Sequence, residues 1–461
     1  MKITSLLNSL LILIFLTVSA NSFAGTAWEV SVLFLGKDED TLFQKDIQNN
    51  IKEIQKIKPS SDLKISVFNE TQKNTTKDIE SFIKKSFTQS NSKKALIIYS
   101  HGLGSQGLKN YSTLELKALL SNTKVKFDML WFDACFMANL EFLFEMRTFS
   151  KLTIASEDAE FSSGLPFESL ENLPTFNNEK EAALNLGRDF ITSYSYLKNG
   201  KQKENVQASS STITIIENKN LDSIVADLKN IKAIFTKLPA NVQNDILKKV
   251  QKNFTMDNPD LMDLGRFLIE LRSKTNNKNE DAFITALIRK LNIDSIKSLK
   301  SNPRIKIKNP TESEVLMVYG LNNWTRGDEK DYKENGEILN SLLKPDGFIE
   351  GEKGKMWPYK KMKKEVMLTP FAPNINTFNY FFISLDAKKV IENPKSIDRS
   401  LDAIWNESKN IQSPILGFGY TQEVGKSAER YTGLNIMRPN SVPDMDYAEF
   451  EFFSIVEWLT L

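Results

Sequence analysis

The chain contains a single histidine, His101, and a single cysteine, Cys135. These two residue types can together perform covalent catalysis, because an imidazole can accept the proton of a thiol and later give it to a leaving group. Cys135 cannot form an internal disulfide, and one cysteine with one histidine cannot make a Cys/His zinc cluster. The pair therefore predicts thiol chemistry, provided that the fold brings the two side chains together.

Each of the two residues follows an apolar run that is typical of a buried β-strand. Strand-like runs lie at residues 28–36, 63–68, 94–100, 127–134, 151–156 and 211–217, and helical patterns lie between them at 40–57, 77–88, 112–120, 136–148 and 178–197. Near-continuous apolar runs indicate strands that are buried on both faces of a parallel sheet. The alternation predicts an α/β layered fold with a mainly parallel sheet flanked by helices.

The remainder of the chain predicts more helices, followed by a region that consists mainly of strands. Helical spacing recurs at 220–237, 241–253, 260–273 and 280–298, and short strand-like runs separated by turn residues follow after about residue 300. We expect an α/β domain over residues 25–300 and a β-rich C-terminal region over 301–461. We also expect the last ~30 residues to pack back on the first domain.

The predicted sheet gives His101 and Cys135 a common location. The carboxyl ends of parallel strands form the crevice where ligands and chemistry gather, and neighbouring strands lie about 4.8 Å apart. We expect Cys135 to open the helix at 136–148, whose N-terminus would favour the thiolate. The backbone N–H groups of Gly102 and Cys135 would then form an oxyanion hole.

The same loop fits other functions less well. Gly102–Gly107 spells G-x-G-x-x-G, but a dinucleotide site needs an early strand–turn–helix unit and an acid about 20 residues later. Ser105 lacks the G-x-S-x-G frame of serine hydrolases, and the histidine precedes it. A non-catalytic binding module on the same scaffold remains the alternative to an enzyme.

Composition and the N-terminus limit the setting of this chemistry. Lys and Arg number 60 against 58 Asp and Glu among 461 residues, a balance that argues against nucleic-acid binding. Residues 1–24 have a basic start, an apolar core and small residues at the cleavage positions, and they predict a cleavable signal peptide. We expect a secreted or periplasmic protein whose mature chain begins near Gly25, with no stable membrane insertion afterwards.

The segments around Cys135 resemble the clostripain family of cysteine peptidases, which have a caspase-like fold. The likeness lies in "YSHG", in the run from Phe132 to Met137 and in the run from Ala155 to Asp158. It is good from about residue 28 to 300 and patchy beyond. The resemblance implies a cysteine endopeptidase that acts on proteins or peptides, with Cys135 as nucleophile and His101 as catalytic histidine. It also places a substrate-pocket acid at Asp133. The oligomeric state stays open at this point, with a monomer favoured.

The sequence departs from the family pattern in three respects. Ser163 stands where the family has the acid of a Gly-Asp-Gly-Trp loop, so the family's preference for Arg or Lys before the cut is weakened, although Glu160 can compensate. The segment before Cys135 is short for a maturation loop, with Lys109 as the residue best suited to cleavage, and activity as an uncut chain is an equal expectation. Some relatives need calcium, but no D-x-[DN]-x-[DN]-G loop is present, and we expect no cofactor.

Overall fold

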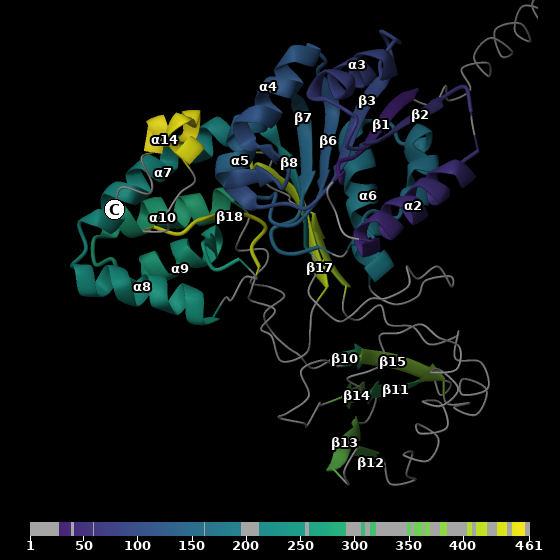
Figure 1. The fold of residues 1–461 in the computed structure, drawn as a ribbon. Coiled ribbons are helices and arrows are strands. Elements are labelled where there is room, and N and C mark those ends of the chain that lie inside the picture. Colours follow the sequence, from purple (N-terminus) through teal and green to yellow (C-terminus); the bar gives the residue numbers. More distant parts are fainter. Residues whose placement is uncertain are drawn as a thin grey trace, which may run out of the picture.

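A mostly parallel sheet of eight strands forms the centre of the protein, seen in the computed structural model in Figure 1. The structure describes residues 27–37, 41–58, 60–160, 162–194, 212–253, 258–291, 306–308, 314–319, 348–351, 355–362, 365–368, 379–384, 403–407, 412–421, 431–439 and 445–456. The predicted signal peptide at 1–24 lies outside these residues.

The strand order in this sheet is β16-β17-β8-β7-β6-β3-β1-β2. The strands are β1 (Trp28–Phe34), β2 (Leu63–Asn69), β3 (Lys93–Tyr99), β6 (Phe127–Asp133), β7 (Ser150–Ala155), β8 (Thr212–Glu217), β16 (Ala403–Glu407) and β17 (Ile415–Thr421). The pairs from β2 to β7 are parallel, and β8, β17 and β16 each pair antiparallel to the preceding strand. The predicted α/β class with a mainly parallel sheet is confirmed.

Helices cover both faces of the sheet (Figure 1). One face carries α2 (Thr41–Lys56) and α6 (Glu179–Tyr194), and the other carries α3 (Thr76–Ser86), α4 (Thr113–Thr123) and α5 (Leu140–Met146). Alternate residues of β6 point to opposite faces of the sheet. Met129 and Trp131 pack with α2 and α6, and Leu130 and Phe132 pack with α4 and α5. A buried strand needs apolar residues at every position for this reason, and the apolar runs in the sequence reflect it.

A helical extension continues the face that carries α5. It comprises α7 (Leu221–Thr236), α8 (Ala240–Asn253), α9 (Leu264–Lys274) and α10 (Lys278–Lys290), and a short strand β9 (Leu261–Asp263) precedes α9. The predicted and observed ends of these helices agree to within a few residues, and the prediction of 280–298 falls outside the described residues after Leu291. The periodic apolar positions therefore located these helices correctly.

The region after residue 300 has its described elements mainly as strands. Apart from β16, β17 and a short strand at Asn435–Met437, the strands are β10 (Lys306–Lys308), β11 (Glu314–Tyr319), β12 (Phe348–Gly351), β13 (Lys355–Met362), β14 (Glu365–Leu368) and β15 (Asn379–Ser384). These six strands pair among themselves, whereas β16 and β17 extend the main sheet beyond β8. The predicted boundary near residue 300 stays a prediction.

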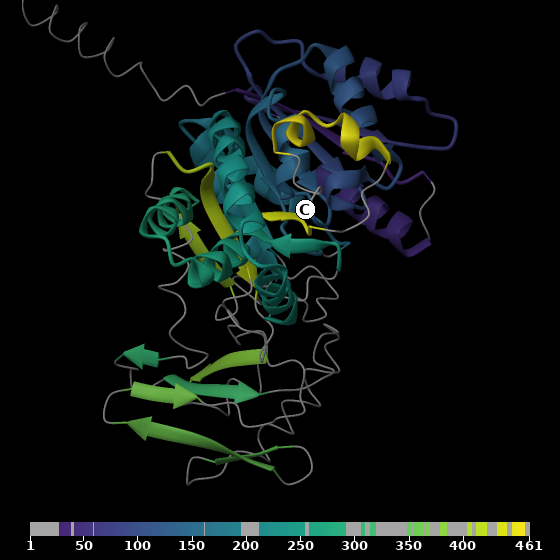
Figure 2. The ribbon, with the colours of Figure 1, turned by 90° about the vertical axis from the view of Figure 1, so that its left-hand side faces the viewer.

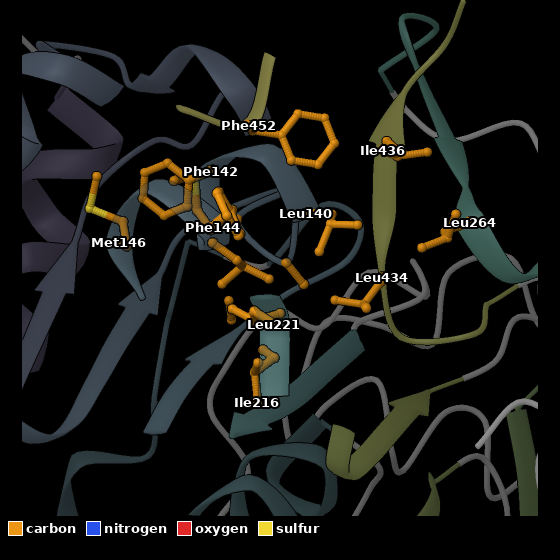
Figure 3. Packing of buried hydrophobic residues seen from close by; sticks show 14 of the residues in the cluster. Leu140, Phe142, Phe144, Met146, Ile216, Leu221, Leu264, Leu434, Ile436 and Phe452 are labelled. Atoms are coloured by element: carbon orange, nitrogen blue, oxygen red, sulfur yellow. The ribbon is translucent and has the colours of Figure 1, made fainter. Parts of the chain in front are cut away.

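The last described elements lie against the α5 face of the sheet. Strand β18 (Asn435–Met437) pairs antiparallel with β9, and helix α14 (Glu451–Val456) packs against α5 and α7. Figure 2 shows α14 lying across this face, and Figure 3 shows Phe452 beside Phe144, with ring centroids 6.1 Å apart. Leu434 and Ile436 belong to the same buried cluster as Leu140 and Leu264 (Figure 3). Burial of these side chains attaches the C-terminal segment to the core.

Candidate active site

His101 and Cys135 lie just beyond the carboxyl ends of two neighbouring strands. Strands β3 and β6 pair in parallel, with Tyr99 opposite Asp133. Each of the two predicted catalytic residues stands two positions after this pair, and both are half-buried. The N–H of Ser100 donates to the carbonyl of Asp133 across 3.3 Å, so the pairing continues past the last strand residues. The register thus brings both residues to one edge of the sheet.

Helix α2 supplies an aromatic support for the histidine. The Phe43 ring stacks on the His101 imidazole with centroids 4.3 Å apart, and it also stacks on Tyr99 at 5.0 Å. The carbonyl of His101 accepts a hydrogen bond of 3.1 Å from the N–H of Lys109, which closes the intervening loop. Lys109 itself is exposed, and its cleavage during maturation stays a prediction.

Cys135 lies in a turn and does not open a helix, which corrects the prediction of a helix over 136–148. Helix α5 begins only at Leu140, and its N-cap is Asn139, whose side chain accepts from the N–H of Phe142 at 2.9 Å. Between them Phe136 has a positive φ of 64°, a conformation that helices exclude. Cys135 therefore does not occupy the N-terminus of α5, where the unpaired N–H groups of the helix lie.

A backbone group from another loop contacts the sulfur instead. The N–H of Glu160 donates to Sγ of Cys135 at 3.2 Å, and the thiol lies 3.8 Å from the carbonyl oxygen of Glu160. An N–H donor at the sulfur stabilises negative charge there. Sequence reasoning missed this contact because it depends on a segment that follows the next strand.

Position 102 requires glycine because its backbone lies very close to the backbone of Cys135. A Cβ at this position would lie 2.0 Å from the carbonyl oxygen of Cys135 and 2.8 Å from Sδ of Met137. The role of Gly102 in an oxyanion hole with Cys135 stays a prediction, and the close packing is an additional constraint.

The predicted pocket acid Asp133 is buried, with 2% of its surface exposed. Its Oδ2 accepts from the N–H of Leu165 at 2.8 Å, and a Cβ on Gly164 would lie 2.6 Å from the same oxygen. Gly164 also has a φ of +63°, which favours glycine. The loop of residues 162–165 is therefore closely packed on this carboxylate.

Ser163 lies within that loop and is half-buried. The loop is fixed on its outer side, because the hydroxyl of Tyr99 donates to the carbonyl of Ser162 and the hydroxyl of Ser162 donates to Asp46 of α2. No acid occupies residues 162–165, so the nearby carboxylates come from other segments and include Asp46, Asp133 and Glu160.

Glu160 is the second acid near the thiol. Both of its carboxylate oxygens are buried, although the residue as a whole is half-buried. Burial raises the pKa of the Glu160 carboxyl well above its usual range, and the neighbouring Asp133 and Cys135 raise that pKa further. Two buried carboxyls that face each other favour a state in which they share one proton.

Further geometry bears on metal and membrane binding. Within the described residues, no three or more His, Cys, Asp or Glu side chains gather in a way that could hold a metal ion. The described helices also include none with the length and hydropathy needed to cross a bilayer.

Comparison with solved structures gives eleven matching chains, among them three that are similar at low identity. An inactive zymogen of a C11 protease from Parabacteroides distasonis is 13% identical, over 94% of this chain and 98% of that one, with a TM-score of 0.46. A secreted C11 cysteine protease from Bacteroides thetaiotaomicron in complex with an irreversible peptide inhibitor is 11% identical, over 93% and 99%, at 0.45. The secreted C11 cysteine protease "iotapain" from the same organism is 14% identical, over 58% and 85%, at 0.43.

A search of curated proteins gave no match. A model of the clostripain family matches residues 26–340, which is more than half of the chain and includes both His101 and Cys135. The chain therefore belongs to the clostripain family of cysteine peptidases.

Proposed function

We propose that the protein is an exported endopeptidase in which Cys135 is the nucleophile and His101 the general base. The observation that carries this proposal is the register of β3 and β6. Tyr99 pairs with Asp133, and the only histidine and the only cysteine each follow their member of this pair by two residues. Export is inferred from the signal-like residues 1–24. The mass of the mature protein recovered outside the cytoplasm tests it, with Gly25 as the expected first residue.

The proposed reaction proceeds by acyl transfer to sulfur and then to water. His101 takes the proton of Cys135, and the thiolate attacks the scissile carbonyl, so that an S–C bond forms. The backbone N–H groups of Gly102 and Cys135 donate to the oxyanion. The proton on His101 then passes to the leaving amine as the C–N bond breaks. Water, deprotonated by His101, attacks the thioester, and release of the acid restores the thiol.

The residue before the cut is proposed to enter a pocket bounded by Asp133, Glu160 and the loop that contains Ser163. The N–H of Leu165 donates to Asp133, and burial together with the neighbouring Asp133 raises the pKa of Glu160, which favours fewer negative charges on this pair than two free carboxylates would carry. A cationic side chain would be favoured, but less strongly than by two ionised carboxylates. We therefore propose a weakened preference for Arg and Lys.

Fluorogenic peptides that differ only in the residue before the cut test these assignments. Cys135→Ala and His101→Ala are each expected to lower kcat/KM by roughly a thousandfold or more, because both groups act in the same step. Lys109→Gln is the matched control, and activity equal to that of the wild type indicates that the uncut chain is active. Cleavage by Cys135→Ala at the wild-type rate would refute a thiol mechanism. A wild-type protein that cleaves no peptide would favour the binding-module alternative.

A further inference from the structure

The segment Tyr431–Met437 passes behind the loop that carries the nucleophile. Strand β18 lies within it, and Asn435 forms a parallel bridge with Asn139, the N-cap of α5. The N–H of Asn435 donates to the carbonyl of Ala138 at 3.0 Å. A segment about three hundred residues from Cys135 thus pairs with the chain directly after it.

The carboxamide of Asn435 connects two loops at once. Its Nδ2 donates to the carbonyl of Phe136 at 3.2 Å and to the carbonyl of Glu157 at 2.6 Å. Its Oδ1 accepts from Nδ2 of Asn139 at 2.9 Å. Asn435 has no exposed surface. Both hydrogens of Nδ2 are therefore used, and a side chain without an amide would leave buried carbonyls unsatisfied.

These two loops are the ones that enclose the thiol. The N–H of Phe136 donates to the carbonyl of Asp158 at 3.1 Å, and the N–H of Ala138 donates to the carbonyl of Ser156 at 2.6 Å. The same 156–160 loop supplies the N–H of Glu160 that contacts Sγ of Cys135. The position of the sulfur therefore depends on how the two loops are held together.

The loop after Cys135 needs this support because its conformation is unfavourable alone. Phe136 has a φ of 64°, and the left-handed region is strained for a bulky residue. Such a conformation persists only where surrounding contacts fix it. The carbonyl of Phe136, which Asn435 holds, belongs to the residue next to the nucleophile.

Resting on the proposed function, we propose that Asn435 is a positioning residue for Cys135. Its carboxamide sets the thiol against Glu160 by holding the backbone on both sides of the sulfur. Two other residues of the segment bond to side chains rather than to loop backbone: Thr432 donates to the carboxylate of Asp263, and Gly433 donates to the carboxylate of Glu157. Asn435 differs from them because it bonds the backbones of the two loops directly.

The test compares Asn435→Asp with the control Thr432→Val. Asp has the same shape as Asn but cannot donate to the two carbonyls. Val at position 432 removes two buried hydrogen bonds, one to Asp263 and one from the N–H of Gly265, and neither touches the 136–138 loop. We expect Asn435→Asp to lower kcat by roughly 10- to 100-fold with KM changed less than about threefold. Thr432→Val is expected to lose stability but to keep kcat.

A second readout is independent of peptide cleavage. Cys135 is the only cysteine, so its alkylation by iodoacetamide can be followed on the whole protein. We expect Asn435→Asp to change the pH profile of alkylation, and Thr432→Val to leave it as in the wild type. If the wild type cleaves nothing, the proposed peptidase function fails, while the alkylation profile still tests the role of Asn435.

A third variant covers the case in which Asn435→Asp does not fold. Asn139→Asp keeps an oxygen to cap α5 but removes the Nδ2 donor that orients Asn435. A folded Asn139→Asp or Asn435→Asp protein with wild-type kcat and a wild-type alkylation profile would overturn the proposal. Equal loss of kcat in Thr432→Val at equal loss of stability would also overturn it, since the effect would then be general destabilisation.

Discussion

Gly102 offers the sharpest test of the active-site geometry, through the substitution Gly102→Ala. An alanine keeps the backbone N–H, so the predicted oxyanion donor is retained. Its Cβ, however, would lie 2.0 Å from the carbonyl oxygen of Cys135 and 2.8 Å from Sδ of Met137. The methyl group and the backbone of the nucleophile cannot both stay where they are.

The size of the expected effect follows from that distance. A carbon atom in contact with a carbonyl oxygen lies about 3.3 Å away or more, so the two segments must separate by about 1.3 Å. A misplacement of about 1 Å can cost a hundredfold in rate, which corresponds to about 2.7 kcal/mol in the activation barrier. Overpacking also costs about 1–3 kcal/mol of stability. We therefore expect kcat/KM to fall by roughly a hundredfold in a protein that is still folded.

The assay measures kcat/KM on the best fluorogenic peptide, together with thermal unfolding. Gly104→Ala is the control: it lies in the same loop, has a positive φ of +68°, and its Cβ would meet only the flexible end of Leu261 at 3.1 Å. It should lower the Tm and leave kcat/KM within a few-fold of the wild type. Wild-type kcat/KM in Gly102→Ala would show that the nucleophile's backbone does not depend on this contact.

Three further results are expected. Ser163→Asp should raise the kcat/KM ratio for Arg over Leu by roughly tenfold, about 1.4 kcal/mol, because it adds a carboxylate beside Asp133; an unchanged ratio would place residue 163 outside the pocket. Burial raises the pKa of Glu160, so this carboxyl loses its proton as the pH rises. The wild-type kcat/KM ratio for Arg over Leu should therefore increase with pH, and in Glu160→Gln the same ratio should be independent of pH. Burial raises the pKa of Glu141 to about 7 from the ordinary 4.5, so the unfolded chain loses this proton at lower pH than the folded one. The free energy of unfolding should therefore decrease by on the order of 3 kcal/mol as pH rises from 4.5 to 7, and urea titrations should find this decrease reduced in Glu141→Gln.

Local sequence patterns were sufficient for the elements that carry the dyad. The apolar runs located β3 and β6, and their parallel pairing follows from the alternation of strands with helices. His101 and Cys135 were found because each is the only residue of its type and each follows a strand. Such features depend on residues close together in the chain.

The geometry around the thiol could not be predicted in this way. Apolar periodicity indicated a helix directly after Cys135, but that segment forms its hydrogen bonds with residues 156–158 and with Asn435 instead. These tertiary contacts outweigh local helix propensity. The stacking of Phe43 on His101 is equally invisible in the sequence, because nothing near Phe43 marks it as a neighbour of the histidine.

The antiparallel pairing of β8 with β17 has a consequence for the chain during its synthesis. Strand β8 is fully buried and rich in Ile and Thr, and its outer partner begins only at Ile415. While the roughly two hundred residues between them are being made, β8 is an apolar edge strand with unpaired N–H and C=O groups. A fragment that ends before β16 therefore presents a template on which a second copy can add a strand. Folding without aggregation therefore depends on how quickly β17 is synthesised and pairs with β8, or on how well a chaperone covers the edge of β8 until then.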